Sequence, residues 1–190
     1  MKYNKILLLL FLIAFMNNNA QEIVTAGGGT LKDWAHLKKY EKENEQLKKI
    51  NEPHRVVFMG NSITEGWSNF DKDFFINNPF VNRGISGQTT PQMLVRFRPD
   101  VVNLNPKAVV ILAGINDIAG NTGPISLENT AENIISMAEI AKANNIKVYI
   151  CSTLPAIDFL WSPGLEPAPK VIKLNTILKN YCSKNNTTYV

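Results

Sequence analysis

The sequence has few of the residues that bind metals or form disulfide bonds: its 190 residues include two histidines and two cysteines. Cys151 ends an apolar run of strand length, and Cys182 lies in a helical pattern. The two thiols could pair in an exported protein, but free buried cysteines are equally consistent with these positions. Neither cysteine has a histidine or another metal ligand at a useful spacing, so the sequence predicts no metal site and no thiol chemistry.

A strong charge of either sign is also lacking. The formal net charge is +4, and removal of an N-terminal segment with Lys2 and Lys5 leaves 18 basic and 16 acidic side chains, or +2. This bias is too weak to indicate a nucleic-acid partner. The lysine-rich stretch 32–49 also contains acidic residues, which is typical of a solvated helix face.

A short apolar run near the N-terminus follows Lys2 and Lys5 and covers Ile6–Phe15. This arrangement is typical of a secretory signal peptide, and the run is too short to span a bilayer comfortably. Cleavage is predicted near Ala20. Asn18 is not the small residue preferred three positions before a cleavage site, so an uncleaved anchor stays open. No cysteine follows the run, which argues against a lipid-anchored form.

The remaining chain is expected to form one exported domain, periplasmic or extracellular. Residues 1–20 are the predicted signal peptide, 21–30 a flexible lead-in, and 31–190 the domain. With 45% hydrophobic and 19% charged residues, the composition is ordinary for a globular protein with a real core. Neither disorder nor a repeat array is indicated.

Apolar runs of strand length alternate with helical patterns along this domain. Five strands are predicted, at Val56–Met59, Phe80–Asn82, Ala108–Leu112, Ile146–Ile150 and Thr187–Val190. Apolar residues at helical spacing predict helices over 31–50, from about Pro91, from the N-cap Ser126 to Asn144, and around 171–181. The alternation predicts an α/β fold, with a central parallel sheet covered by helices on both faces.

Three polar loops follow three of the predicted strands and contain Ser62, Gly84 and Asn116. Any one of these residues has an ordinary explanation in a turn or a helix cap. In a parallel sheet, however, the carboxyl ends of the strands lie side by side along one edge, where ligands bind. Ser62 could attack an acyl carbon there. The backbone N–H groups of Ser62 and Gly84 and the side-chain amide of Asn116 would then stabilise the oxyanion. Gly84 suits this role because a residue without Cβ lets a substrate approach the main chain.

The motifs around these residues resemble the first three conserved blocks of the SGNH/GDSL hydrolases. They are Gly60-Asn61-Ser62-Ile63-Thr64, Asn82-Arg83-Gly84 and Gly114-Ile115-Asn116-Asp117. Pro155 and the segment 159–164 also resemble the fourth-strand loop of secreted bacterial members, and the likeness extends from about residue 31 to the end.

The resemblance implies a chemistry and a fold. Ser62 would be the nucleophile, and Gly84 and Asn116 would be oxyanion donors. The implied fold is a flavodoxin-like three-layer α/β/α sandwich, and the implied reaction is ester hydrolysis without a metal or a cofactor. Asn61 stands where the family name has aspartate, a substitution familiar in this branch.

The fourth block of the family, Asp-x-x-His, should follow the fifth strand and supply the general base and its orienting acid. The sequence stops at Val190, so we expect a fragment that lacks roughly one helix and this block. The string Asp33-Trp34-Ala35-His36 matches the pattern but falls in the predicted N-terminal helix, and His54 precedes the first strand and so belongs on the opposite edge of the sheet. Loss of the base removes about 10⁶-fold in kcat, so this chain is predicted to be nearly inactive.

The substrate is predicted only as a small-molecule ester. Export and Trp161, which could stack on a sugar ring or simply pack, suggest an acetylated carbohydrate, while a small acyl ester or a lysophospholipid stays open. The competing interpretation is a non-catalytic binding module on the same fold.

Overall fold

The computed structural model describes residues 33–190. The predicted signal peptide and lead-in lie outside the described residues. Five strands form one sheet in the order β2-β1-β3-β4-β5, and every neighbouring pair is parallel. Their bounds are Val56–Gly60 (β1), Phe80–Gly84 (β2), Ala108–Leu112 (β3), Lys147–Ile150 (β4) and Thr188–Tyr189 (β5). The predicted parallel sheet is therefore confirmed, with each strand within two residues of its expected bounds.

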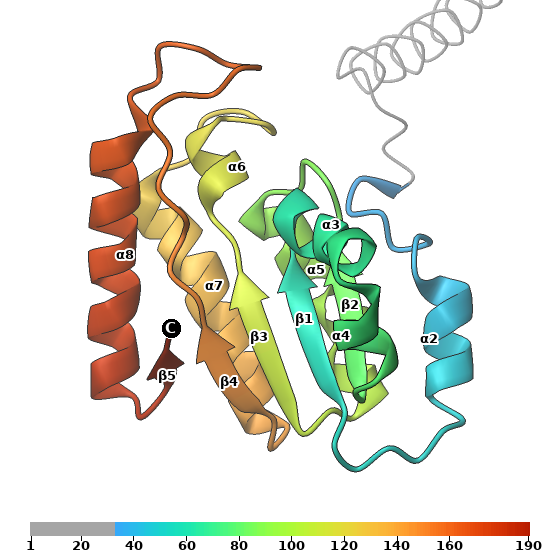
Figure 1. The fold of residues 1–190 in the computed structure, drawn as a ribbon. Helices are drawn as coiled ribbons and strands as arrows, with labels where there is room; N and C mark the ends of the chain where they lie inside the picture. Colours follow the sequence, from blue (N-terminus) through green and yellow to red (C-terminus); the bar gives the residue numbers. More distant parts are fainter. Residues whose placement is uncertain (1–32) are drawn as a thin grey trace, which may run out of the picture. The chain divides into compact units, whose positions relative to one another are not determined.

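Helices flank the sheet and give the three-layer α/β/α architecture that was predicted. Their bounds are Glu41–Leu47 (α2), Ser62–Phe70 (α3), Lys72–Ile76 (α4), Thr90–Asp100 (α5), Ile115–Ile118 (α6), Leu127–Ala143 (α7) and Pro167–Lys184 (α8), with a 3₁₀ turn at Val102–Leu104. Figure 1 shows α3 and α4 in front of the sheet and α5 and α7 behind it. Helix α8 packs against α7, and α2 lies beyond the β2 edge and contacts α5.

The hydrophobic core lies mainly between the sheet and the α5–α7–α8 layer. Val109 and Ile111 of β3 are fully buried, whereas Val110 and Leu112, which point to the other face, are only partly buried. Successive side chains of a strand point to opposite faces, so this difference means that the two faces of β3 are covered unequally. Within residues 33–190, no helix is long and apolar enough to cross a membrane.

Two predicted helix boundaries of the C-terminal half are close to those observed. Ser126 is the N-cap of α7, and its hydroxyl accepts a hydrogen bond from the Asn129 amide, as predicted. Asn144 ends this helix. Helix α8 begins at Pro167, four residues before the first residue of its predicted apolar face.

Cys151 and Cys182 are both free thiols. Of the two alternatives that the sequence left open, a disulfide bond or two free cysteines, the structure has the second.

The predicted helix over 31–50 was wrong over residues 33–40. Residues 33–40 form turns, and regular α-helix extends only from Glu41 to Leu47. His36 has φ +55°, a left-handed conformation that interrupts a right-handed helix. The apolar spacing was misleading because Leu37 is exposed, whereas the residue that α2 buries is the polar Asn44. The string Asp33-x-x-His36 therefore lies in turns, not on a helix.

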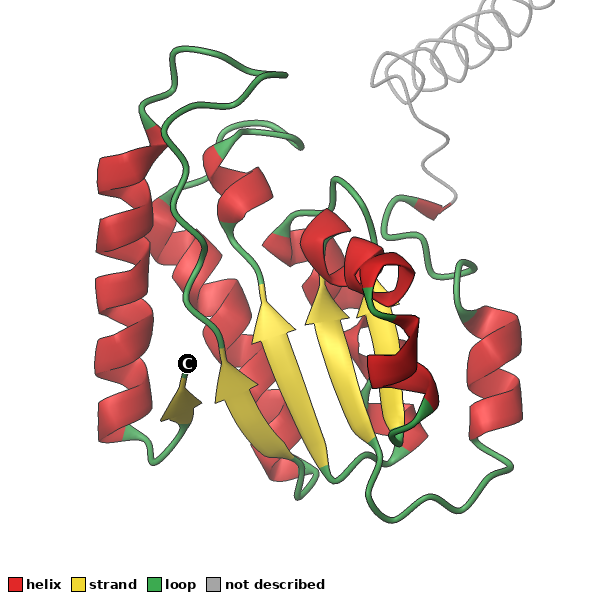
Figure 2. Cartoon of the chain, in the orientation of Figure 1, coloured by secondary structure: helices red, strands yellow, loops and turns green. Residues whose placement is uncertain are grey.

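The register of the sheet brings the three predicted site loops together. Gly60 of β1 pairs with Gly84 of β2 on one side and with Leu112 of β3 on the other. The loops that follow these three residues therefore leave the sheet at one level. Figure 2 shows the arrowheads of these strands at the same edge, with the loops and short helices above them.

Candidate active site

Ser62 is the first residue of α3 and is exposed. The preceding turn is tight: a Cβ on Gly60 would lie 2.1 Å from the Thr64 hydroxyl oxygen, so only glycine fits there. Asn61 caps the helix, with its side-chain oxygen accepting a hydrogen bond from the Ile63 amide at 3.1 Å. Within residues 33–190, neither the hydroxyl nor the amide of Ser62 has a hydrogen-bond partner. A serine with both groups free at a helix N-terminus is suited to attack a carbonyl and to help hold the oxyanion.

The requirement for glycine at position 84 has a different cause from the one predicted. A Cβ at this position would lie 2.1 Å from the backbone nitrogen of Glu65, so the missing side chain makes room for α3, not for a substrate. The Gly84 amide donates to the side-chain oxygen of Asn82 at 2.8 Å, and its carbonyl accepts from the Tyr40 hydroxyl. An amide that already donates to a neighbouring side chain is a poor donor for an oxyanion.

Gly87, three residues further on, has the features expected of that donor. Its φ of +77° is a conformation that favours glycine, and its amide has no hydrogen-bond partner within the described residues. Its carbonyl accepts from the side-chain amide of Asn121 at 3.0 Å. The sequence prediction placed this donor at Gly84, not at Gly87. The available signal was the second glycine of the same Arg83–Gly87 segment.

Asn116 lies at the start of α6 and is almost fully buried. Its side-chain NH₂ donates to the carbonyl of Gln88 at 2.9 Å, which joins the β3 loop to the residue after Gly87. A side-chain amide has two N–H donors, so this bond leaves one of them for a ligand. The structure thus brings the Ser62, Gly87 and Asn116 loops to one edge of the sheet.

Asp117, next to Asn116, holds the start of α5. Its carboxylate accepts from the Thr90 amide at 3.0 Å and from the Thr90 hydroxyl at 2.6 Å. Burial raises the pKa of Asp117, and the bonds from Thr90 oppose that rise. The acid therefore anchors the segment after the Gly87 loop.

Glu65 connects α3 to the Gly87 loop. One of its carboxylate oxygens accepts from the Ser86 amide at 2.7 Å and also from the Ser86 hydroxyl, and the other accepts from the Lys39 ammonium. Partial burial acts to raise the pKa of Glu65, but the bonds from Lys39 and Ser86 together outweigh it and lower the pKa. The residue before Gly87 is thereby fixed to the helix that begins with Ser62.

A buried polar network lies beneath these loops. Arg96 of α5 donates to the carbonyl of Gly60 at 3.1 Å and forms an ion pair with Asp100 at 2.9 Å. Asn44 of α2 donates to Asp100 at 2.6 Å and accepts from the Arg83 side chain at 3.0 Å. The network therefore joins the turn before Ser62 to α2, α5 and β2.

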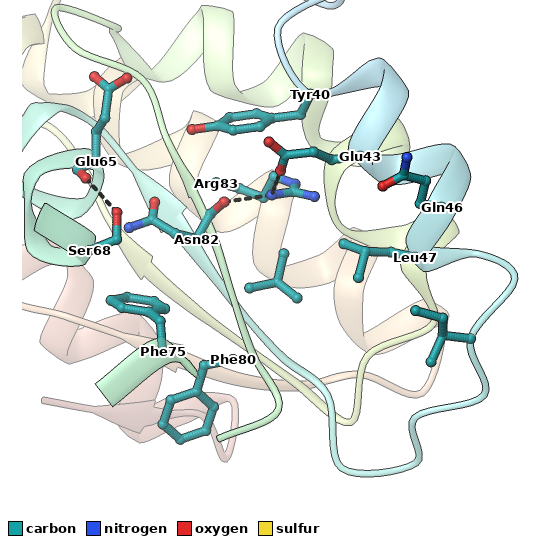
Figure 3. Close-up of a pocket in the computed structure, with 12 residues that line it drawn as sticks. Tyr40, Glu43, Gln46, Leu47, Glu65, Ser68, Phe75, Phe80, Asn82 and Arg83 are labelled. Atoms are coloured by element: carbon teal, nitrogen blue, oxygen red, sulfur yellow. Dashed lines mark hydrogen bonds and ion pairs between the residues drawn. The ribbon is translucent and has the colours of Figure 1, made fainter. Parts of the chain in front are cut away.

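A cavity of about 430 Å³ lies along the outer edge of β2, and Figure 3 shows the side chains that line it. The Tyr40 ring covers the Arg83 guanidinium at 4.4 Å, and Arg83 pairs with Glu43 at 3.2 Å. Burial, more than the nearby Glu65 charge, raises the pKa of Tyr40 to about 12. Neither Ser62 nor Asn116 lines this cavity, so it is separate from the candidate active site.

In the described part of the chain, no histidine is hydrogen-bonded to Ser62. His36 is exposed in the turn before α2. His54 is exposed just before β1 begins, on the edge of the sheet opposite Ser62, as predicted. Among residues 33–190, no group of three His, Cys, Asp or Glu side chains could hold a metal ion.

Comparisons with known proteins agree on one family. Residues 58–190 match the model of the GDSL-like Lipase/Acylhydrolase family. The structure is similar to that of a candidate acylhydrolase from Bacteroides fragilis, with 51% identity, a TM-score of 0.80, and coverage of 84% of this chain and 77% of that one. It is also similar to a GDSL-like lipase from Bacteroides thetaiotaomicron, with 49% identity, a TM-score of 0.79, and coverage of 82% and 77%.

A curated relative is the uncharacterized lipoprotein YqeF of Bacillus subtilis, with 33% identity over 120 residues. The alignment covers 54% of this chain and 49% of that relative, so it spans about half the length of each.

Proposed function

The chain belongs to the GDSL-like lipase/acylhydrolase family, and from this premise we propose that it forms the core of a serine ester hydrolase with Ser62 as nucleophile. The observation that carries the proposal is the free Ser62 hydroxyl at the N-terminus of α3, beside two loops with unbonded N–H donors. The Ser62 oxygen would bond to the acyl carbon while the carbonyl oxygen becomes an oxyanion. The alkoxide would leave with the proton taken from Ser62, and water would then hydrolyse the acyl-enzyme.

We propose Gly87 in place of Gly84 as the second backbone donor to the oxyanion. The three donors would then be the amides of Ser62 and Gly87 and the side-chain NH₂ of Asn116. Their support is physical: two of these amides have no other partner within residues 33–190, whereas the Gly84 amide is bonded to Asn82 at 2.8 Å. Preorganised donors of this kind contribute about 10²- to 10³-fold each to kcat.

The base that takes the Ser62 proton would be a histidine other than His36 and His54, the two in this sequence. Both are exposed and neither bonds to Ser62. We therefore propose that the 190-residue chain alone has little activity and that a histidine from an Asp-x-x-His block completes the site. In serine hydrolases the nucleophile without its base retains only about 10³- to 10⁴-fold acceleration over water.

The proposed substrate is a small-molecule ester, and an acetylated carbohydrate fits best. Trp161, in the loop between β4 and α8, is 62% exposed, so its ring face is open to a ligand. An exposed indole face can cover the apolar face of a sugar ring. The proposed export rests on the predicted N-terminal signal peptide, and the 33% identical relative is itself named a lipoprotein.

The test of Ser62 uses the full-length product of the gene and hydrolysis of p-nitrophenyl acetate. Ser62→Ala should lower kcat by about 10⁴-fold or more and abolish labelling by a fluorophosphonate, because the nucleophile is gone. Ser68→Ala is the matched control, since Ser68 lies on the same helix and its hydroxyl donates only to the Glu65 carbonyl, at 3.0 Å. Full activity in Ser62→Ala would exclude Ser62 from the mechanism. A folded wild-type protein that is neither labelled nor active would favour the binding module.

A further inference from the structure

A single side chain, Asn121, connects the three parts of the candidate site. Its NH₂ donates to the Gly87 carbonyl at 3.0 Å, and its side-chain oxygen accepts from the Trp161 indole N–H at 3.2 Å. Its backbone amide donates to the Asn116 carbonyl at 3.1 Å. Asn121 therefore contacts both residues proposed as oxyanion donors on the β2 and β3 loops, and also the exposed tryptophan of the β4–α8 loop.

We propose that Asn121 is a positioning residue, which orients the Gly87 amide for the oxyanion and at the same time holds Trp161 as a platform for a ring of the substrate. This inference rests on the proposed ester hydrolase function and adds to it. It assigns Asn121 a role through Gly87 and Trp161, and it assigns Trp161 a role in recognising the substrate.

Gly87 needs such support because glycine alone does not hold one backbone conformation. Its neighbours are each fixed on one side: Ser86 bonds to Glu65 of α3, and the Gln88 carbonyl bonds to Asn116. Without Asn121, the Gly87 carbonyl would have no hydrogen-bond partner within the described residues. Fixing that carbonyl, together with the bond that holds Ser86, limits rotation about φ and ψ of Gly87 and so orients its amide. A donor that is already oriented needs no reorganisation during the reaction.

The neighbouring residue strengthens the same contact between loops. The Thr122 hydroxyl lies 2.9 Å from the Thr89 hydroxyl, so the turn after α6 docks on the β2–α5 loop at two points. Gly120 and Gly123, with φ of +74° and +97°, let the chain turn sharply on either side of this contact. Asn121 thus lies in a sharp turn, and the bond from its backbone amide to the Asn116 carbonyl holds this turn in place.

Trp161 is held at its polar end, and 62% of its surface stays exposed. Its indole N–H bonds to Asn121, and its ring lies at 33° to the ring of the buried Phe159, with 5.1 Å between centroids. A ring fixed in this way loses little conformational entropy when a ligand covers it. The expected ligand is an ester whose alcohol or acyl part has a flat apolar face, such as a pyranose ring.

The chemistry of the asparagine amide allows the two bonds to be separated. Asn121→Asp keeps an acceptor for Trp161 but removes the donor to Gly87, because a carboxylate has no N–H. Trp161→Phe keeps an aromatic face but removes the N–H that bonds to Asn121. Asn129→Asp, on the exposed first turn of α7, is the matched control for the added charge.

In the full-length product of the gene, Asn121→Asp should lower kcat for p-nitrophenyl acetate about 10- to 100-fold with little change in KM. Trp161→Phe should leave this small substrate nearly unaffected and raise KM for an acetylated xylo-oligosaccharide several-fold. Asn129→Asp should behave as wild type. The proposal would be overturned if Asn121→Asp had the kcat of wild type. It would also be overturned if Trp161→Phe and wild type had the same KM for the sugar ester.

A second measurement needs no activity and uses the 190-residue chain. With Trp34 and Trp67 replaced by Phe, fluorescence reports Trp161 alone, and Asn121→Leu should increase its quenching by acrylamide because the indole is released. Unchanged quenching would overturn the coupling between Asn121 and Trp161. If quenching rises while Ser62→Ala retains activity, the contact is real and the proposed catalytic function is what fails.

Discussion

Two neighbouring glycines, at positions 84 and 87, show how residues of the same type serve different purposes. Gly84 lies in β2, where a Cβ would collide with the backbone of Glu65 in α3. Gly87 lies in the following loop with open space around it, where the nearest atom to an added Cβ is 4.0 Å away. The requirement for glycine is therefore steric at Gly84 and conformational at Gly87. Only the second leaves its amide free for a ligand.

These two positions should respond differently to alanine. Gly84→Ala should lower the free energy of unfolding by about 3 kcal/mol, because the new methyl group meets backbone that cannot move aside. Gly87→Ala should cost only about 1–2 kcal/mol, the strain of a side chain at positive φ. Urea unfolding followed by circular dichroism gives both values. Equal losses would contradict the assignment of steric and conformational roles.

At the scale of elements, side-chain bonds fix α3 to the β2–α5 loop. The central bond is between Glu65 and Ser86, with Lys39 on the other carboxylate oxygen. These contacts hold the helix that carries Ser62 beside the loop that carries Gly87. Because they use an ionised carboxylate, the attachment depends on pH.

The pKa of Glu65 is lowered in the folded protein from an ordinary value of 4.5. Its contribution to stability is therefore fully present above pH 4.5 and is lost as the pH falls through the lowered pKa. Wild type should be more stable than Glu65→Gln at pH 7, and the difference should shrink toward pH 3. Urea unfolding at both pH values measures it.

Glu132→Gln, at an exposed position of α7, is the control for removing one carboxylate. A difference between wild type and Glu65→Gln that stays constant from pH 7 to pH 3 would argue against an ionised Glu65 in this attachment.

At the scale of the whole molecule, the Arg96–Asp100 pair connects its own helix, α5, through further hydrogen bonds to elements that are distant in the sequence. Both side chains are almost fully excluded from solvent, and Asn44 and the Gly60 carbonyl complete their hydrogen bonds. A buried charge is tolerated only when it is paired and hydrogen-bonded. The turn before Ser62 therefore depends on contacts that reach as far as α2.

Removing one partner of this pair should be costly. Asp100→Ala should lower the free energy of unfolding by about 3–5 kcal/mol, because it leaves the Arg96 charge buried and unpaired. Asp100→Asn should cost less, since an amide oxygen still accepts a hydrogen bond. Asp73→Ala, at an exposed position of α4, should stay within about 0.5 kcal/mol of wild type in the same urea experiment. A loss in Asp100→Ala as small as in Asp73→Ala would show that the pair does not join these elements.

Local patterns in the sequence were sufficient for the strands and for part of the site. Continuous apolar runs such as Ala108–Leu112 are typical of strands in a parallel sheet that is covered on both faces, and this strand has the predicted bounds. The carboxyl ends of parallel strands meet at one edge, so Ser62 and Asn116 could be expected on neighbouring loops before any coordinates were known.

Other features were decided by contacts between residues far apart in the chain. The turn at His36 and the buried Asn44 replace the predicted first helix because α2 packs through a polar network, which apolar spacing does not record. Gly84 and Gly87 differ only through their contacts with α3 and Asn121. The bonds from Asn121 to Gly87 and Trp161 span 34 and 40 residues, and only the folded chain brings such groups within hydrogen-bond distance. Short-range periodicity thus determined the sheet, and tertiary packing determined which amides stay free at its edge.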